Sequence, residues 1–155
     1  MTTTARTFLM FEGDAEAAMH HYVEVFGGEI LSLTRHPDEL PPEQVEAMEQ
    51  AKAAGMDMQM NDVAGKVLFA AFRIADQTIY CSDSSVQHAF GFTPSVSLFV
   101  EVAESVEVDR IASALGDGGA ELMPPSDEYG FSPRFAWVQD RWGVTWQISS
   151  RPLTY

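Results

Sequence analysis

The chain has 155 residues, of which 46% are hydrophobic and 11% aromatic, and its formal net charge at pH 7 is −14. This length predicts one domain, or two small modules that share a core, and the hydrophobic content excludes wholesale disorder. The negative charge argues against nucleic acid as a partner, because a polyanion would be repelled, whereas it permits cationic small molecules.

Three features of the sequence predict a cytoplasmic protein. The single cysteine, Cys81, cannot form an internal disulfide, which suits a reducing compartment. No apolar run approaches the roughly 18 residues of a membrane span, so we expect no membrane partner. Residues 1–6, MTTTAR, lack the basic region and apolar core of a signal peptide.

The first part of the chain predicts a strand, a helix and three further strands, with an insertion among them. Asp14 is placed as the N-cap of a helix that runs to about Phe26, where a glycine pair ends it. Residues 36–61 are rich in proline, acidic residues and methionine, and we expect an insertion with one helix over residues 43–54. Strands are predicted at Thr7–Phe11, 29–34, 66–74 and 78–82.

The second part of the chain predicts the same elements without an insertion. A linker over residues 83–93 leads to a strand at 95–102, and Glu104 and Ser105 then open a helix over residues 106–115. A short strand at 120–123 and a loop at 123–133 follow. The chain then reads as an aromatic hairpin from Phe135 to Ile148, FAWVQDRWGVTWQI, with Asp140 and Gly143 in its turn.

An internal repeat determines the expected fold. The glycine pair at 27–28 lies 91 positions before the pair at 118–119, and Leu9 lies 90 positions before Phe99. The last strands of the two halves are only 67 positions apart, and this shortfall is about the length of the insertion. We therefore predict an α+β fold of two βαβββ modules. The modules span residues 1–83, with the insertion at 36–61, and residues 94–155.

Three segments resemble the vicinal-oxygen-chelate superfamily, also called the glyoxalase/bleomycin-resistance/dioxygenase fold. They are FLMFEGDAEAAMHHYVEVFGGEI, KVLFAAFRIADQTIYCSD and WVQDRWGVTWQIS, and the last is close to the DRFGVSWQI signature of the PhnB-like, demethylubiquinone-methyltransferase-like branch. The resemblance implies paired modules whose mixed sheet curls into an open cup, usually in a homodimer. No glycine-rich loop follows a strand in a parallel βαβ unit, so no S-adenosylmethionine site is expected.

The resemblance also indicates where the ligands of a metal ion would lie. Metal-using members place one ligand on the first strand and one on the last strand of each module, and the matching positions here are Thr7, Tyr80, Ser97 and Gln147. Hydroxyls and phenols are not usual ligands of a catalytic transition metal, and an amide is a weak one. Many relatives also carry a histidine where this chain has Phe69. We therefore expect no metal and no cofactor.

Strand alternation predicts which residues face into the cup. An apolar, aromatic interior with a few hydroxyls and one amide is the usual composition of a small-molecule pocket, although a filled core has the same pattern. We expect Tyr129, Phe131 and Arg134 of the loop to form a rim. The predicted ligand pocket consists of Thr7, Leu9, Phe11, Phe69, Tyr80, Ser97, Phe99, Phe131, Thr145 and Gln147.

The insertion has two possible roles at this point. Its helix is either a lid over the cup or a part of the dimer contact. Its alternating methionines, Met56, Met58 and Met60, are interpreted as flexible packing rather than as a ligand surface.

Three functions are compatible with these observations. The favoured one is metal-independent binding of a small organic molecule, and the residues point to no particular catalytic group. The second is sequestration of a cationic drug, as in bleomycin-binding resistance proteins, which the acidic charge and an expected homodimer suit. The third is a metal-dependent lyase, isomerase or dioxygenase of the glyoxalase type, which would need a divalent site.

Overall fold

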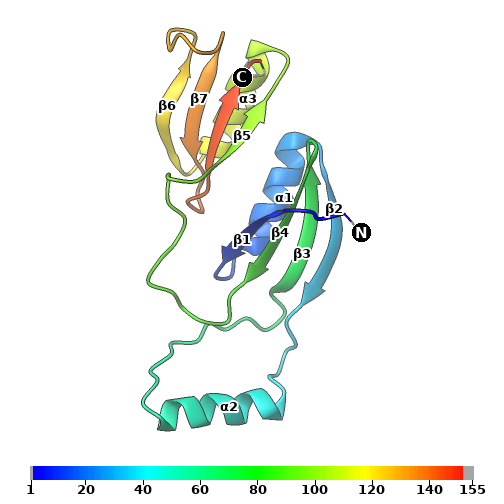
Figure 1. The fold of residues 1–155 in the computed structure, drawn as a ribbon, viewed down its shortest axis with the longest axis vertical. Helices are drawn as coiled ribbons and strands as arrows, with labels where there is room; N and C mark the ends of the chain where they lie inside the picture. The colour runs from blue at the N-terminus through cyan, green and yellow to red at the C-terminus, as the bar shows by residue number, and fades with distance from the viewer. Residues whose placement is uncertain (1, 152–155) are drawn as a thin grey trace. The chain divides into compact units, whose positions relative to one another are not determined.

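The computed structural model describes residues 2–151 and divides into two compact units that meet in the sequence at Ala89 and Phe90. The first unit, module one, holds one four-stranded sheet and two helices, and the second, module two, holds one sheet and one helix (Figure 1). Each helix has 12 residues, and none of those in the described part of the chain is long and apolar enough to span a membrane.

The two modules have the same topology. In module one the sheet order is β1-β4-β3-β2, with β1 parallel to β4 and the other neighbours antiparallel; module two repeats this order as β5-β8-β7-β6. The prediction of two βαβββ modules, the first with a helical insertion, is therefore confirmed.

The elements of module one are β1 (Thr7–Phe11), α1 (Ala15–Phe26), β2 (Glu29–Arg35), α2 (Pro42–Ala53), β3 (Val67–Ile74) and β4 (Gln77–Asp83). Those of module two are β5 (Ser97–Glu101), α3 (Ser105–Gly116), β6 (Ala120–Ser126), β7 (Phe135–Gln139) and β8 (Thr145–Ser149).

Each core lies between one helix and one face of its sheet. In module one the rings of Tyr22 on α1 and Phe72 on β3 lie 6.1 Å apart, and both side chains are fully buried. In module two the buried face of α3, with Ile111 and Leu115, belongs to the same core as Trp146 of β8. Each such aliphatic or aromatic side chain contributes about 1.5–3 kcal/mol by its burial. These cores leave the opposite face of each sheet, here called its open face, without a helix of its own module.

The start of α1 differs from the prediction. Asp14 occupies the N-cap position, but its side chain makes no capping hydrogen bond. The carboxylate of Asp83, at the end of β4, instead accepts the backbone N–H groups of Gly13 (2.7 Å) and Ala15 (3.0 Å). An anionic acceptor at a helix N-terminus satisfies orphan donors and complements the helix dipole. Helix α1 is therefore capped from a distant strand.

Strand β6 also differs from the prediction, because it continues through two prolines to Ser126. Proline cannot donate to a sheet ladder, which is why a strand was expected only as far as Met123. The structure places β6 at the edge of its sheet, and its pairing with β7 is irregular between Met123 and Ser126. An edge strand tolerates prolines since one of its sides needs no partner.

Candidate functional site

The open face of module one is aromatic. The strand register places Phe8 of β1 opposite Tyr80 of β4, and the ring of Phe69 on β3 lies 6.4 Å from Phe8 and 5.0 Å from Tyr80. Phe8 and Phe69 are exposed. Among the described residues, the Tyr80 hydroxyl has no hydrogen-bond partner. The face therefore offers rings rather than a set of polar groups.

The predicted orientation of β1 is wrong. Leu9 lies opposite Cys81, and Phe11 lies opposite Asp83, so both side chains point to the face that α1 covers, where they are only 6% and 5% exposed. Thr7 lies opposite the buried Ile79, on the same face as Leu9. These three residues therefore do not share the open face with Tyr80 and Phe69.

In module two the register brings the predicted residues together. Ser97 lies opposite Thr145 and Phe99 opposite Gln147, so all four side chains are on the open face. Strand β7 adds Trp137, which lies opposite Gln147 on its other side. Trp137 is not among the predicted pocket residues, although its pairing with Gln147 follows from folding the hairpin about Asp140 and Gly143.

A chain of hydrogen bonds fixes the polar groups of this face. The Thr145 hydroxyl donates to the carbonyl oxygen of Val96 (2.8 Å), so the Ser97 hydroxyl must donate to Thr145 Oγ1 (2.7 Å). The Ser97 oxygen then accepts the indole N–H of Trp137 (3.1 Å). The two hydroxyls are thus used to orient the Trp137 ring, and they are not spare groups for a ligand.

Gln147 is the polar group of this face that stays available. Its side chain is half-buried between Phe99 and Trp137 on the neighbouring strands, and its amide makes no hydrogen bond to any residue that the structure describes. Phe99 is 41% exposed. An unpaired amide beside two aromatic rings can hold a planar polar group of a ligand.

The loop between β6 and β7 extends the aromatic surface. The ring of Phe131 lies 4.8 Å from Phe135 in an edge-to-face contact, and the ring of Tyr129 stacks on Phe131 at 6.0 Å. Arg134, predicted at the rim, instead forms a bidentate pair with Asp109 of α3 (2.7 and 2.9 Å), and this hydrogen bonding raises the pKa of its guanidinium. Phe131 and Tyr129 thus extend the aromatic surface next to Phe135, whereas the side chain of Arg134 is bound to α3.

The donor set does not fit the divalent metal of the superfamily. No group of three or more histidine, cysteine, aspartate or glutamate side chains that could hold a metal ion occurs within residues 2–151. Of the four positions matched to metal ligands, Thr7 faces α1, and Ser97 is engaged by Trp137 and Thr145. The remaining two are the phenol of Tyr80 and the amide of Gln147, which are poor ligands for a catalytic transition metal.

Cys81 is not placed for nucleophilic catalysis. Its thiol is fully buried on the face that α1 covers, and burial, with a smaller effect of the nearby Asp83, raises its pKa to about 12. A nucleophilic cysteine needs the thiolate form and access to a substrate. The structure gives Cys81 neither of these.

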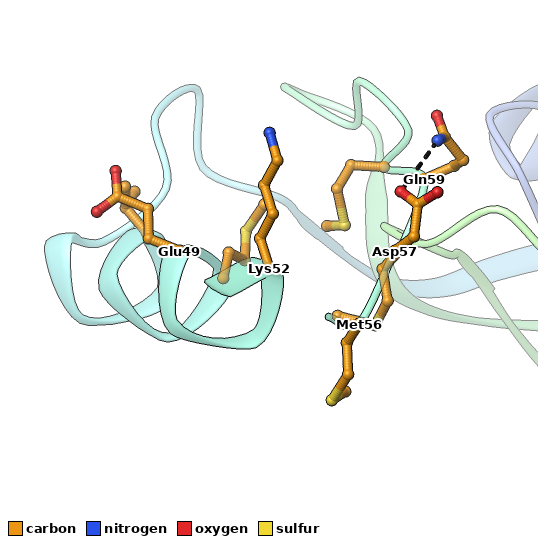
Figure 2. A pocket seen from close by; sticks show the side chains of 9 residues that line it. Glu49, Lys52, Met56, Asp57 and Gln59 are labelled. Atoms are coloured by element: carbon orange, nitrogen blue, oxygen red, sulfur yellow. Dashed lines mark hydrogen bonds between the residues drawn. The ribbon is translucent and has the colours of Figure 1, made fainter. Parts of the chain in front are cut away.

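The structure shows a pocket outside the predicted ligand site (Figure 2). It lies in the insertion, has a volume of about 340 Å³, and is here called the thioether pocket. Met56 and Met58 are 54% and 43% exposed, so their interpretation as packing residues is wrong. The pocket is lined by Val45, Met48, Glu49, Lys52, Met56, Asp57, Met58, Gln59 and Met60.

The chain is similar to a known protein family and to solved structures. A family model described as 3-demethylubiquinone-9 3-methyltransferase matches residues 43–149. A Bacillus cereus structure described as a 3-demethylubiquinone-9 3-methyltransferase and PhnB protein is 37% identical, with a TM-score of 0.76, and the match covers 95% of this chain and 98% of that one. A search of curated proteins returns no match.

More distant structures share the fold. Protein PA1353 from Pseudomonas aeruginosa is 19% identical with a TM-score of 0.70, over 96% of this chain and 97% of that one. A mutant of the fosfomycin resistance protein FosX from Listeria monocytogenes, in complex with Mn(II) and dihydroxypropylphosphonic acid, is 13% identical with a TM-score of 0.58. That match covers 99% of this chain and 93% of the FosX chain.

Proposed function

The chain belongs to the 3-demethylubiquinone-9 3-methyltransferase family, the PhnB-like branch of the vicinal-oxygen-chelate superfamily, and on this premise we propose that it binds a small organic molecule on the open face of module two. The observation that carries the proposal is the amide of Gln147, which has no partner among the described residues and lies between Phe99 and Trp137. An amide that no protein group engages, beside two aromatic rings, is free to pair with a polar group of a ligand that stacks on those rings.

The ligand class follows from the groups that are offered. Exposed aromatic rings favour a flat apolar body, and an amide pairs with a group that both donates and accepts, such as another amide or a carboxylic acid. The indole of Trp137 is held in place by Ser97, so it forms a preorganised wall. We propose that the ligand is an aromatic amide or acid that stacks on these rings and pairs with Gln147.

The indole N–H signals in an NMR spectrum test this proposal on the full chain. The three tryptophans are Trp137, Trp142 and Trp146, and only the first has its N–H bonded on the open face to Ser97. The N–H of Trp146 donates to the buried carboxylate of Asp140 (3.0 Å) and serves as an internal control. Titration with aromatic amides and acids should shift the Trp137 signal saturably and leave the Trp146 signal unchanged.

Two variants check the role of the amide. Gln147→Leu keeps the size of the side chain and removes its hydrogen bonds, so it should weaken binding about fivefold to tenfold. Tyr80→Phe removes a polar group at the equivalent position of module one and should leave binding unchanged. If no aromatic amide or acid moves the Trp137 signal, or if Gln147→Leu binds as tightly as the native chain, the proposal fails.

A metal-dependent activity is the competing proposal. The FosX structure contains Mn(II), and this chain shares its fold. Thermal unfolding of chelator-treated protein with added Mn²⁺, and then with other divalent ions, tests it, because a ligand at a hundredfold excess over its dissociation constant stabilises the folded state by about 2.7 kcal/mol. We expect no saturable shift of the melting temperature. A shift that Gln147→Leu removes would favour the metal-dependent activity.

Two further expectations accompany this proposal. A homodimer is tested by sedimentation velocity, and a cytoplasmic location by fractionation of the producing cells.

Sequestration of a cationic drug is an alternative proposal. It is tested by titration with bleomycin, a cationic glycopeptide whose binding to an acidic protein should weaken as salt is added.

A further inference from the structure

The thioether pocket is formed by two short pieces of the insertion. Val45, Met48, Glu49 and Lys52 lie at positions i, i+3, i+4 and i+7 of α2, so they form one stripe along the helix. The opposite wall is the stretch from Met56 to Met60, which follows α2 after a turn at residues 54–55. Figure 2 shows Lys52 rising from α2 on one side of the pocket, with Asp57 and Gln59 on the other side.

The floor of the pocket is apolar and adaptable. Four of the eight methionines of the chain line it, together with Val45. Methionine has a flexible, polarizable side chain and is used on surfaces that accept ligands of varied shape. The volume of about 340 Å³ lies at the lower end of the range of small-molecule pockets, which is about 300–1,000 Å³.

Helix α2 does not belong to the core of module one. None of its residues is buried, its N-cap is Pro41 with no capping side-chain bond, and its C-cap is Ala54 rather than a glycine. A helix of 12 residues is marginal in water without tertiary packing. The stripe of α2 that lines the pocket is therefore not covered by the core of module one, which leaves the pocket open to a small molecule.

The charges of the insertion favour a positively charged molecule in this pocket. Glu49 and Asp57 place two carboxylates at the pocket and Lys52 one ammonium, and none of the three forms an ion pair in the part of the chain that the structure describes. The insertion contributes a net charge of −5 to the total of −14, from six carboxylates and one ammonium. Its carboxylates are Asp38, Glu39, Glu43, Glu46, Glu49 and Asp57.

We propose that the thioether pocket binds a small lipophilic cation, with an aromatic or aliphatic body on the methionine side chains and a positive charge attracted by the carboxylates of Glu49 and Asp57, which lie on opposite sides of the pocket (Figure 2). Cations are attracted by the local field of the insertion, and apolar contact with the thioethers supplies the rest of the affinity. This site is in module one and is separate from the ligand face proposed for module two. The inference does not rest on the function proposed above.

A matched pair of probes tests the sign of the charge. Benzyltrimethylammonium and phenylmethanesulfonate share an aromatic body and carry opposite charges. We would titrate each into the full chain, labelled with ¹³C at the methionine methyl groups. The cation should shift the methyl signals of Met48, Met58 and Met60 saturably, and the anion should not. Met19, which is buried on α1, is the internal control.

Charge variants sharpen the test, and the pocket residues can be changed without disturbing a core. Glu49→Gln combined with Asp57→Asn should weaken binding of the cation about tenfold, as expected for two exposed charge pairs. Lys52→Gln should tighten it about threefold by removing a repulsive charge. The control is Glu24→Gln with Glu128→Gln, which changes the net charge equally outside the insertion and should leave binding unchanged.

Several outcomes would overturn the inference. These are equal binding of the anion, an unchanged affinity in the Glu49→Gln, Asp57→Asn variant, and an equal loss in the control variant. A lack of methyl shifts at a cation concentration of about 10 mM would also overturn it, because a weaker site has no specific affinity to explain. The same samples report the Trp137 indole signal, so failure here and failure of the site on module two are seen separately.

Discussion

The two modules have the same backbone plan and the same aromatic pair on their open faces. The rings of Phe8 and Phe69 in module one lie 6.4 Å apart at 37°, and the rings of Phe99 and Phe135 in module two have the same distance and angle. Phe8 lies 91 positions before Phe99, and Phe69 lies 66 positions before Phe135. The repeat therefore extends from the strand order to individual side chains.

Beside this pair the modules differ. The adjacent positions hold Ala71 and Tyr80 in module one, but Trp137 and Gln147 in module two. The indole N–H and the amide thus occur at these positions in module two, with Ser97 to orient the indole. The shared backbone thus supplies an aromatic surface twice, whereas the indole N–H and the amide occur at these positions in module two only.

The buried carboxylates are also placed differently. Asp83 joins three segments of module one, because it accepts the N–H groups of Gly13 and Ala15 and, through its other oxygen, that of Val67 (3.0 Å). Asp140 closes the β7–β8 hairpin of module two. It accepts the N–H groups of residues 142 (2.9 Å) and 144 (3.0 Å) and the indole N–H of residue 146. Each module therefore depends on one carboxylate, at positions that the repeat does not relate.

Removal of these carboxylates should give the largest effects. Asp83→Ala and Asp140→Ala each remove the acceptor of three N–H donors, two of them buried, and each should lower the free energy of unfolding by about 3–5 kcal/mol. Urea unfolding measures this with two local probes. The three tryptophans, all in module two, report on that module by fluorescence, and accessibility of the Cys81 thiol reports on module one. Asp83→Ala should affect the thiol probe most, and Asp140→Ala the fluorescence.

Two controls accompany this experiment. Asp76→Ala removes an exposed carboxylate in the β3–β4 turn and should change stability little. Asp83→Asn and Asp140→Asn keep one acceptor oxygen and should fall between the native chain and the alanine variants. A loss below about 1 kcal/mol in either alanine variant would show that the carboxylate does not hold its module together.

The second prediction concerns Gly28 and Gly119, which occupy equivalent positions of the two modules. A Cβ atom on Gly28 would collide with the carbonyl oxygen of Arg73, and one on Gly119 would collide with that of Gln139. Backbone atoms cannot move aside cheaply, so Gly28→Ala and Gly119→Ala should each cost about 3 kcal/mol. Gly27→Ala is the control, because its φ is +64° but no atom lies within 4 Å of its Cβ, and it should cost about 1 kcal/mol.

Urea unfolding of the three alanine variants decides whether the two modules are equivalent here. Equal losses at Gly28 and Gly119, both larger than at Gly27, would support equivalence. A loss at Gly28→Ala no larger than at Gly27→Ala would mean that the connection between α1 and β2 can move away from β3. In that case the close approach would be a requirement of module two only.

The fold could be predicted because its signals are local and occur twice. Strand alternation, helix periodicity and the glycine pairs each predict an element without knowledge of its neighbours. The orientation of β1 was predicted wrongly because Leu9 was matched to Phe99 at a spacing of 90. The spacing of 91 between the glycine pairs, applied to β1, would have matched Phe8 to Phe99 and placed the correct residues on the open face.

Other features depend on contacts between distant segments and have no local signal. The capping of α1 by Asp83 joins residues that are 68 to 70 positions apart. The use of Ser97 and Thr145 to orient Trp137 follows only from the strand register. The thioether pocket was missed for another reason: a methionine stripe normally indicates packing, and only the structure shows that no core covers it.

The third prediction compares Cys81 with Ile148, which lies at the equivalent position 67 residues later. Burial raises the pKa of the Cys81 thiol to about 12, above the ordinary value of about 8.5 that it has in the unfolded chain. The neutral thiol therefore stabilises the folded state fully below about pH 8.5, and this stabilisation is lost as the pH rises toward 12. At about pH 9.5 the loss should be about 1 kcal/mol.

The difference in unfolding free energy between the native chain and Cys81→Ala measures this loss. The alanine variant has a cavity, so it is less stable at pH 7.5, but it has no thiol to ionise, and the difference should shrink by about 1 kcal/mol at about pH 9.5. Ile148→Cys in the Cys81→Ala background should restore the alkaline decline, because burial is the larger cause of the raised pKa and Ile148 is buried as deeply as Cys81. A thiol at position 148 that left stability independent of pH would mean that module two opens or hydrates at this strand, and that the two cores protect equivalent positions unequally.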